Sequence, residues 1–196
     1  MRNLLFYLKA PFFIPHYIFF LLYKEPTLEY ELLRWAEVLR IKRNSKASLF
    51  FELIITLKEY RSLFYLRLGG KSLLISWYSP GMTNLYFDVP SNAIGKGLVI
   101  QHGHSTRLNP QSCGDNCQIW HNATVGKGKS GGAKPVIGNN VLISTGACII
   151  GEINIGNNAV IGAGSVVIKD VPENSVVVGN PSRIVRLNGE KVSIML

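Results

Sequence analysis

The chain has few cysteines and no metal-binding cysteine pattern. Its 196 residues include three cysteines, Cys113, Cys117 and Cys148, and no CxxC pair. An odd count without that pair argues against both a zinc knuckle and a disulfide framework. We therefore predict unpaired thiols, two of them filling apolar positions, in a protein of a reducing compartment.

Acidic residues are also scarce. The chain has 12 Asp and Glu against 21 Lys and Arg, a net charge of +9. The excess is larger in residues 1–87 (12 against 6) than in residues 88–196 (9 against 6). A basic surface suits an anionic small molecule or an acidic membrane, or it is simply solvated. Nucleic acid is not an expected partner, because the chain shows no nucleic-acid motif and no stripe of arginines with aromatics.

The apolar runs are short for a bilayer span, which stays open only as a further alternative for residues 1–25. The longest, residues 10–23, has 14 residues and includes two prolines and His16, whereas a span needs about 20. No small-residue cleavage site follows it, so a signal peptide is not expected. We predict that residues 1–25 form a packed helical hairpin or a subunit contact, with peripheral contact to the inner membrane face as the alternative.

The chain does have a period of six residues. Each repeat opens with an aliphatic or small residue: Cys113, Ile119, Val125, Ile137, Ile143, Ile149, Ile155, Ile161 and Val167. An earlier set, Ile94, Ile100 and Thr106, has the same period but is offset by one inserted residue. Period six fits a short strand followed by a tight turn, with Gly or Asn at the corner. Such repeats build a parallel β-helix.

Several segments between Asp88 and Val185 carry a family resemblance. They are IGKGLVIQHG, LNP, CGDNCQI, GKGKSGG, IGAGSVVIKDVP and GNPSRIV. This stretch resembles the hexapeptide acyltransferases, and within them the serine acetyltransferases and related sugar O-acetyltransferases. The resemblance implies a mainly β fold, a left-handed parallel β-helix preceded by an N-terminal α-helical region. The handedness comes from the resemblance alone, because parallel connections are usually right-handed.

The remaining pattern divides the chain into three parts. Residues 27–68 have apolar side chains at helical spacing, with Thr27 near the first helix start. Ser48 is predicted to cap a second helix, which Gly69 and Gly70 end. We predict an N-terminal helical region over 1–83, a β-helix acyltransferase domain over 84–187 and a C-terminal tail over 188–196.

The resemblance implies an acetyl-CoA-dependent O-acetyltransferase that moves an acetyl group to a hydroxyl of serine or of a sugar. His102 follows IGKGLVIQ, the position of the catalytic histidine in the serine acetyltransferases, and imidazole suits a general base near neutral pH. Asp88 is the candidate to orient it, since one coil of about 18 residues could bring the two together. The alternative for Asp88 is a turn residue. In the serine enzymes the matching aspartate falls one position earlier, at Phe87 here.

Two departures from the serine enzymes concern the acceptor. Gln101 stands where they have an aspartate, and the Gly-rich loop has Lys134 instead of a second histidine. Both missing groups help to hold the amino acid in that family, so a sugar hydroxyl becomes a second candidate acceptor. His104 and His121 are predicted to line the acceptor pocket with Gln101, or else to be surface residues at coil edges.

The resemblance also implies a donor site. The pantetheine amides would pair with backbone groups near Thr145 and Ala163, at matching corners of successive coils. The Gly-rich loop from Gly126, with Lys127 and Lys129, would cover acetyl-CoA. Lys169 and Arg183 are the candidates for the CoA phosphates. Acetyl-CoA is then the co-substrate, and no metal is expected.

Two other classes of function stay open. One is a non-catalytic scaffold or a membrane-docked binding module. The other is a zinc enzyme of the β-helix carbonic anhydrase type, with His102, His104 and His121 as ligands. The resemblance further implies a homotrimer with active sites between subunits. The expected location is cytoplasmic, with the inner membrane face as the alternative.

Overall fold

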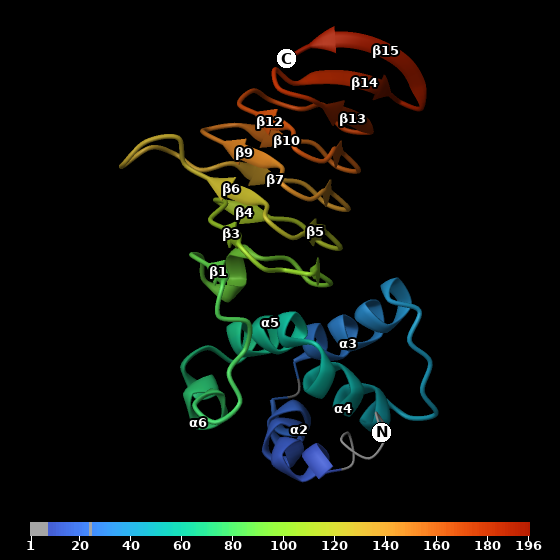
Figure 1. Cartoon of the computed structure of the whole chain (residues 1–196), viewed down its shortest axis with the longest axis vertical. Helices are drawn as coiled ribbons and strands as arrows, with labels where there is room; N and C mark the ends of the chain where they lie inside the picture. The colour runs from blue at the N-terminus through green and yellow to red at the C-terminus, as the bar shows by residue number, and fades with distance from the viewer. Residues whose placement is uncertain (1–7, 24) are drawn as a thin grey trace. The chain divides into compact units, whose positions relative to one another are not determined.

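The structure is a computed structural model that describes residues 8–23 and 25–196 (Figure 1). The chain divides into two compact units, Met1–Thr83 and Asn84–Leu196. The first is helical and the second is a stack of short strands. Part of the predicted membrane-contact segment, residues 1–7 and 24, lies outside the described residues. None of the helices described is long and apolar enough to cross a membrane.

The helical unit contains short helices joined by tight connections. They are η1 (Ala10–Phe13), α2 (Ile14–Leu22), α3 (Pro26–Val38), α4 (Lys46–Thr56), α5 (Lys58–Leu68), η2 (Gly69–Ser72) and α6 (Leu73–Ser76). The predicted cap at Ser48 is wrong. Ser45 caps α4, because its extended backbone lets its Oγ accept the Ser48 N–H at 3.1 Å. Leu57 is also extended and divides the predicted second helix. The predicted end is confirmed: α5 stops at Leu68, and Gly69 has φ +58°.

The core of the helical unit is aromatic and tightly enclosed. Trp35, Phe50 and Phe64 are at most 1% exposed. The Phe50 ring lies 4.9 Å from Phe20 and 5.6 Å from Phe64, measured between ring centroids. Such tilted and edge-on pairs suit aromatic quadrupoles. Through these contacts α2, α4 and α5 pack against one another.

In the second unit, strands two or three apart in the chain pair in parallel to make three faces. Face A contains β1 (Leu85–Phe87), β3 (Thr106–Leu108), β6 (Thr124–Gly126), β9 (Cys148–Ile150) and β12 (Val166–Val167). Face B contains β4 (Ser112–Cys113), β7 (Val136–Ile137) and β10 (Asn154–Ile155). Face C contains β2 (Val99–Gln101), β5 (Gln118–Trp120), β8 (Leu142–Ile143), β11 (Val160–Ile161) and β13 (Ser175–Val178). Each coil therefore runs through faces C, A and B in turn.

The repeat residues form buried ladders inside this coil. On face C the ladder is Ile100, Ile119, Ile143, Ile161 and Val177. Thr106 was predicted to continue the repeat on face A, and that is wrong. Leu108 pairs with Val125 in register and is 1% exposed. The step from Ile100 to Leu108 is eight residues instead of six, so two extra residues fall at the corner between faces C and A.

The C-terminal residues close one end of face C. Strand β14 (Arg183–Leu187) pairs antiparallel with β13, and β15 (Glu190–Met195) pairs antiparallel with β14. Residues 188–196, predicted as a C-terminal tail, therefore extend face C with an antiparallel strand. Asn188 and Gly189, with φ of +50° and +85°, make the two-residue turn that folds this segment back.

Candidate active site

The corner between faces C and A carries two of the predicted histidines. His102 follows β2 with φ +52°, and Ser105 has φ +55°. The His104 N–H donates to the His102 carbonyl at 2.6 Å, which makes the corner tight. His102 and His104 are both exposed. The two extra residues of this coil thus form a bulge that presents two imidazoles, while the strands on either side keep their register.

The same corner recurs in the next coils and aligns four predicted site residues. The Asn122 N–H donates to the His104 carbonyl at 2.9 Å, and the Gly146 N–H donates to the His121 carbonyl at 3.1 Å. The Gly164 N–H donates to the Thr145 carbonyl at 2.9 Å. Along this first edge the equivalent positions are therefore His104, His121, Thr145 and Ala163. Successive strands lie about 4.8 Å apart, so the four residues form a continuous row.

The imidazoles of this row are in contact. His104 and His121 stack, with ring centroids 4.7 Å apart and planes 22° apart. The His102 ring lies 6.2 Å from His121 and 6.5 Å from Trp120. The Nδ1 atom of His121 is buried and has no hydrogen-bond partner in the structure. Buried polar atoms are normally satisfied, so this unpaired nitrogen marks His121 as a candidate part of the site.

Two further predicted residues lie at this first edge. Gln101 ends β2, in register with Trp120 on the neighbouring strand. Arg183 begins β14 and pairs with Val178, next to the coil corner at Gly179. Trp120 was missed in the sequence. Its signal is an aromatic residue at the end of a repeat strand, directly before His121.

The remaining predicted residues lie at a second edge, the corner between faces A and B. The Asp88 N–H donates to the Leu108 carbonyl at 2.9 Å, and the Gly151 N–H donates to the Gly126 carbonyl at 3.0 Å. Lys169 falls between β12 of face A and Val171, which bridges to Ile155 of face B. Face A therefore separates these residues from His102 within one chain.

Asp88 does not meet His102 within the chain, so the predicted proximity is corrected. Its Oδ2 accepts from Arg107 Nη1 at 2.7 Å, and both side chains are partly exposed. The physical reason is the coil itself. Asp88 follows β1 at the far end of face A, whereas His102 stands where the chain enters that face. An orienting role for Asp88 remains a prediction that a single chain does not fulfil.

The Gly-rich loop projects from the second edge between β6 and β7 (Figure 1). It turns at Gly131, with φ +71°, where the Gly132 N–H donates to the Lys129 carbonyl at 3.0 Å. Lys127 and Lys129 are both exposed. At the root of the loop the Asn109 Oδ1 is buried without a partner in the structure. Asn109 belongs to the LNP segment, but its side chain was not singled out in the sequence.

The three histidines of the first edge do not make a metal site. Among the residues described, no group of three or more His, Cys, Asp or Glu side chains is arranged to hold a metal ion. The stacked His104 and His121 rings instead lie face to face. The zinc-enzyme alternative therefore finds no support in this part of the chain.

Comparison with known proteins identifies the family. No protein-family model matches the chain. The serine acetyltransferase of Bacillus subtilis (strain 168) is 36% identical over 160 residues, which cover 73% of this chain and 71% of that protein. The chain belongs to the serine acetyltransferase family. The predicted family resemblance is thereby confirmed, together with the acyltransferase class of its relatives.

Other members of the serine acetyltransferase family match a smaller share of their own length. Serine acetyltransferase 1, chloroplastic, of Arabidopsis thaliana is 48% identical over 99 residues, 49% of this chain and 32% of that protein. The chain spans about half or less of several curated relatives that it matches.

Solved structures of serine acetyltransferases share the fold. The Brucella abortus strain S19 protein in complex with coenzyme A has a TM-score of 0.63 and 29% identity, over 85% of this chain and 68% of that one. The Neisseria gonorrhoeae protein in complex with serine has a TM-score of 0.60 and 28% identity, over 82% and 68%. The predicted fold class, a hexapeptide-repeat β-helix after a helical region, is confirmed.

Proposed function

We propose that this chain is an acetyl-CoA-dependent O-acetyltransferase with His102 as its general base. The observation that carries the proposal is the register of the first edge. It sets an exposed imidazole beside a row of coil corners that reaches Thr145 and Ala163. A base at one end of a straight row of backbone groups suits a reaction on a thioester held by a long, amide-bearing arm.

The reaction then needs one proton acceptor and one site for developing charge. His102 takes the proton of the acceptor hydroxyl while the oxygen attacks the thioester carbonyl. Backbone N–H groups at the corner stabilise the tetrahedral oxyanion. The carbon–sulfur bond breaks, the acetyl group stays on the acceptor oxygen, and the imidazolium returns the proton to the CoA thiolate. No covalent acyl-enzyme forms.

The donor residues divide between the two edges. Thr145 and Ala163 at the first edge would pair with the pantetheine amides, and Arg183 at the same edge would meet a phosphate. Lys127, Lys129 and Lys169 at the second edge supply the other cations. The Brucella abortus protein was solved with coenzyme A, which supports a CoA-type donor for this chain.

This division supports the proposed homotrimer. His102 and the row of coil corners lie on the first edge, while Asp88 and the Gly-rich loop lie on the second. If the second edge of one copy meets the first edge of the next, both sets of residues border one site. Three such contacts close a ring with identical interfaces. Light scattering of the full chain should give the mass of a trimer, and a monomer would refute this part of the proposal.

L-Serine is the first candidate acceptor, because the Neisseria gonorrhoeae relative was solved with serine. A sugar hydroxyl is the second, for a reason visible at the first edge. An ammonium group needs an acidic partner, and the described residues of this edge include no carboxylate, so in the trimer that partner would have to come from the second edge of the neighbouring copy. The acidic residues of the unit lie elsewhere: Asp88, Asp115, Glu152, Asp170, Glu173 and Glu190.

The test is release of free thiol from acetyl-CoA, with L-serine and with a panel of simple and nucleotide-linked sugars. We expect His102→Ala to lower kcat by roughly 10²- to 10⁴-fold while CoA binding, measured by calorimetry, is retained. His104→Ala, at the same corner, should raise the KM for the acceptor more than it lowers kcat, because His104 is predicted to line the acceptor pocket. Unchanged turnover in His102→Ala would overturn the role of the base. Absence of CoA binding by the native chain would favour the scaffold. A cytoplasmic location goes with the proposal.

A further inference from the structure

One face of the helical unit exposes an unusual number of apolar side chains. On η1 and α2 they are Phe12, Ile14, Ile18, Leu21 and Leu22, and on or next to α6 they are Leu73, Leu74 and Trp77. Leu22 is 74% exposed and Trp77 is 79% exposed. The opposite side of α2 packs His16 and Phe20 against aromatic rings of the unit. Helix α2 is thus apolar on both sides. A helix with this pattern is usually buried on both sides.

These two segments lie side by side, so their exposed residues form one surface. At one end, Lys71 Nζ lies 4.4 Å from the centroid of the Tyr23 ring. At the other end, the Tyr78 hydroxyl donates to the Phe12 carbonyl at 3.1 Å. We call the exposed side chains of both segments the apolar face. A contiguous apolar surface rimmed by polar groups marks an interaction site.

The rim of the apolar face is positively charged on the side of Phe12, whereas Leu21 on the same face borders a cavity with Glu25 and Glu29. Residues 8–23 and 61–87 contain no Asp or Glu. Lys9, Lys58 and Arg61 line a cavity of about 300 Å³ together with Phe12 and Tyr78. We call it the basic cavity. It adjoins the apolar face, because Phe12 belongs to both.

Arg61 is a buried cation without an acidic partner. It is 6% exposed, and its guanidinium donates to the carbonyls of Ile54, Pro80 and Ile55 at 2.9 to 3.1 Å. These acceptors are neutral, and no carboxylate among the described residues forms an ion pair with it. A buried charge of this kind is stabilised by an anion. The basic cavity therefore favours a negatively charged ligand.

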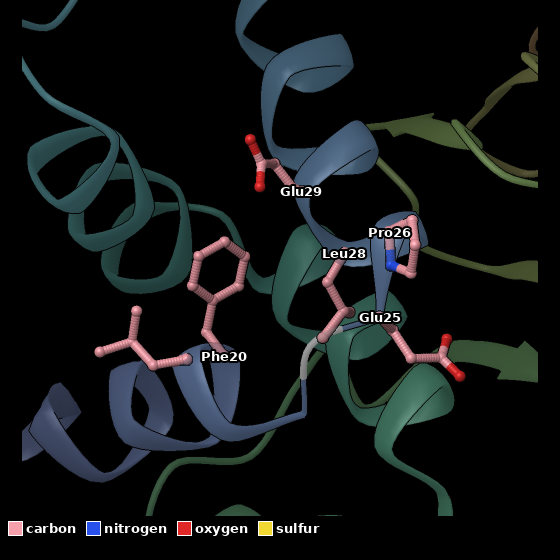
Figure 2. A pocket seen from close by; sticks show the side chains of 6 residues that line it. Phe20, Glu25, Pro26, Leu28 and Glu29 are labelled. Carbon is pink, nitrogen blue, oxygen red and sulfur yellow. The ribbon is translucent and has the colours of Figure 1, made fainter.

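A second cavity of the unit has the opposite character. It measures about 380 Å³ and is lined by Phe20, Leu21 and Leu28 with the acidic residues Glu25 and Glu29 (Figure 2). Glu29 forms an ion pair with Lys46. An anion would meet two carboxylates there, so the acidic cavity serves as an internal comparison.

We propose that the helical unit docks on an anionic lipid surface. The apolar face lies in the interface, and the basic cavity takes the phosphate of an anionic headgroup. Leu and Ile on one side of a short helix, with a neighbouring Trp and flanking lysines, fit the interface between headgroups and acyl chains. A second copy of the chain is a poorer occupant, since it would bring a second set of the same cations against the first.

The experiment is flotation of the full chain with lipid vesicles. We expect binding to vesicles of phosphatidylcholine with phosphatidylglycerol, and little binding to phosphatidylcholine alone. Leu22→Asp combined with Trp77→Asp should abolish flotation, whereas Leu33→Asp, on the exposed side of α3, should not. Lys9→Gln with Lys58→Gln should weaken binding by at least roughly tenfold, because each lysine near an anionic surface contributes a factor of about five. Lys42→Gln is the matched control.

Four results would overturn the proposal. The first is no flotation with either vesicle. The second is equal flotation of the native chain and the Leu22→Asp, Trp77→Asp variant. The third is a combination of two results: no flotation of the native chain, and a lower mass of that variant than of the native chain when both are sedimented without vesicles. This combination would assign the apolar face to a contact between copies. Binding of inorganic phosphate without flotation would likewise reject the lipid. Thiol release by each variant, measured in parallel, reports the active site independently.

Discussion

The two units of the chain are stabilised in different ways. In the β-helix the same few contacts recur at each coil: an aliphatic side chain inside, and a backbone hydrogen bond to the coil before. In the helical unit each contact occurs once and joins residues far apart in the chain. Glu31 and Arg67, for example, are 36 residues apart and almost fully buried. The fold of the β-helix can therefore be predicted from a repeat period, whereas the stability of the helical unit depends on individual pairs of residues.

The polar core of the helical unit shows this dependence. His16 Nε2 lies 2.7 Å from the Tyr65 hydroxyl, which donates to the Ser79 carbonyl at 2.5 Å. Because the hydroxyl has a single proton, His16 Nε2 must carry the hydrogen toward Tyr65. The neutral tautomer suits the site, since burial and the nearby Arg61 lower the pKa of His16 to about 4. One network thus joins η1, α2, α5 and the segment after α6.

The largest expected effect on stability is at the Glu31–Arg67 pair. Arg67 Nε and Nη2 donate to Glu31 Oε1 at 3.1 and 2.6 Å, and the two side chains are 4% and 2% exposed. Arg67→Met leaves a buried carboxylate without its guanidinium, which costs about 3 to 5 kcal/mol. Hydrogen exchange followed by mass spectrometry should show the loss of protection in α3 and α5, with the β-helix strands unchanged.

The matched control is the double variant Glu31→Leu with Arg67→Met. Replacing both partners by apolar groups of similar size removes the buried charge, so most of the lost protection should return. A double variant as unstable as the single one would assign the cost to packing and not to charge. Loss of protection in the β-helix as well would show that the two units unfold together and would break the comparison.

The same contrast explains what the sequence could predict. The inward ladder from Ile119 to Val167 followed from period six, because each coil repeats its neighbour. The period could not locate the two extra residues beside His102, since the step from Leu108 to Cys113 is one residue short and only a net insertion of one residue shows in the sequence. In the helical unit nothing local marks Arg61 as a buried cation, because its acceptors are backbone carbonyls.

The candidate site was predicted in part for the same reason. His121, Thr145 and Ala163 sit at repeat corners, so their alignment follows from counting residues. Asp88 was placed by distance along the chain, but a coil has three corners, and a count of one coil does not say which of them a residue reaches. Its contact with Arg107 depends on side chains across one face, which periodicity does not specify.

Lowering the pH should destabilise the helical unit by a smaller amount than the loss of Arg67 does. His16 is fully buried, and its pKa falls from 6.5 to about 4. Below pH 6.5 the unfolded chain binds a proton there that the folded unit excludes, so stability is lost as pH falls from 6.5 to 4 and is unaffected above that range. The loss is roughly 2 to 3 kcal/mol. Hydrogen exchange in α2 and α5 across this range measures it. His16→Phe should remove the pH dependence, and a persistent slope would assign it to other groups.

The smallest effect tests whether the β-helix depends on any single residue. Asn158 stands at a corner between faces B and C with φ +58°. Its side chain accepts from Asn140 Nδ2 at 3.1 Å and donates to Asn174 Oδ1 at 2.8 Å. Asn158→Gly keeps the left-handed backbone and loses these exposed bonds, so we expect a cost of about 0.5 to 1 kcal/mol.

Asn158→Ala loses the same bonds and adds the strain of a Cβ at positive φ, about 1 kcal/mol more. The difference in unfolding free energy between the two variants, measured with denaturant, separates the cost of backbone strain from the cost of losing the side-chain hydrogen bonds to Asn140 and Asn174. Neighbouring coils keep their own corners, at Asn140 and Asn174 with φ of +56° and +54°. The damage should therefore stay within the affected coil, as expected for a repeat stabilised by nearest neighbours. If Asn158→Ala instead exposes strands on all three faces, the β-helix relies on single residues as much as the helical unit does.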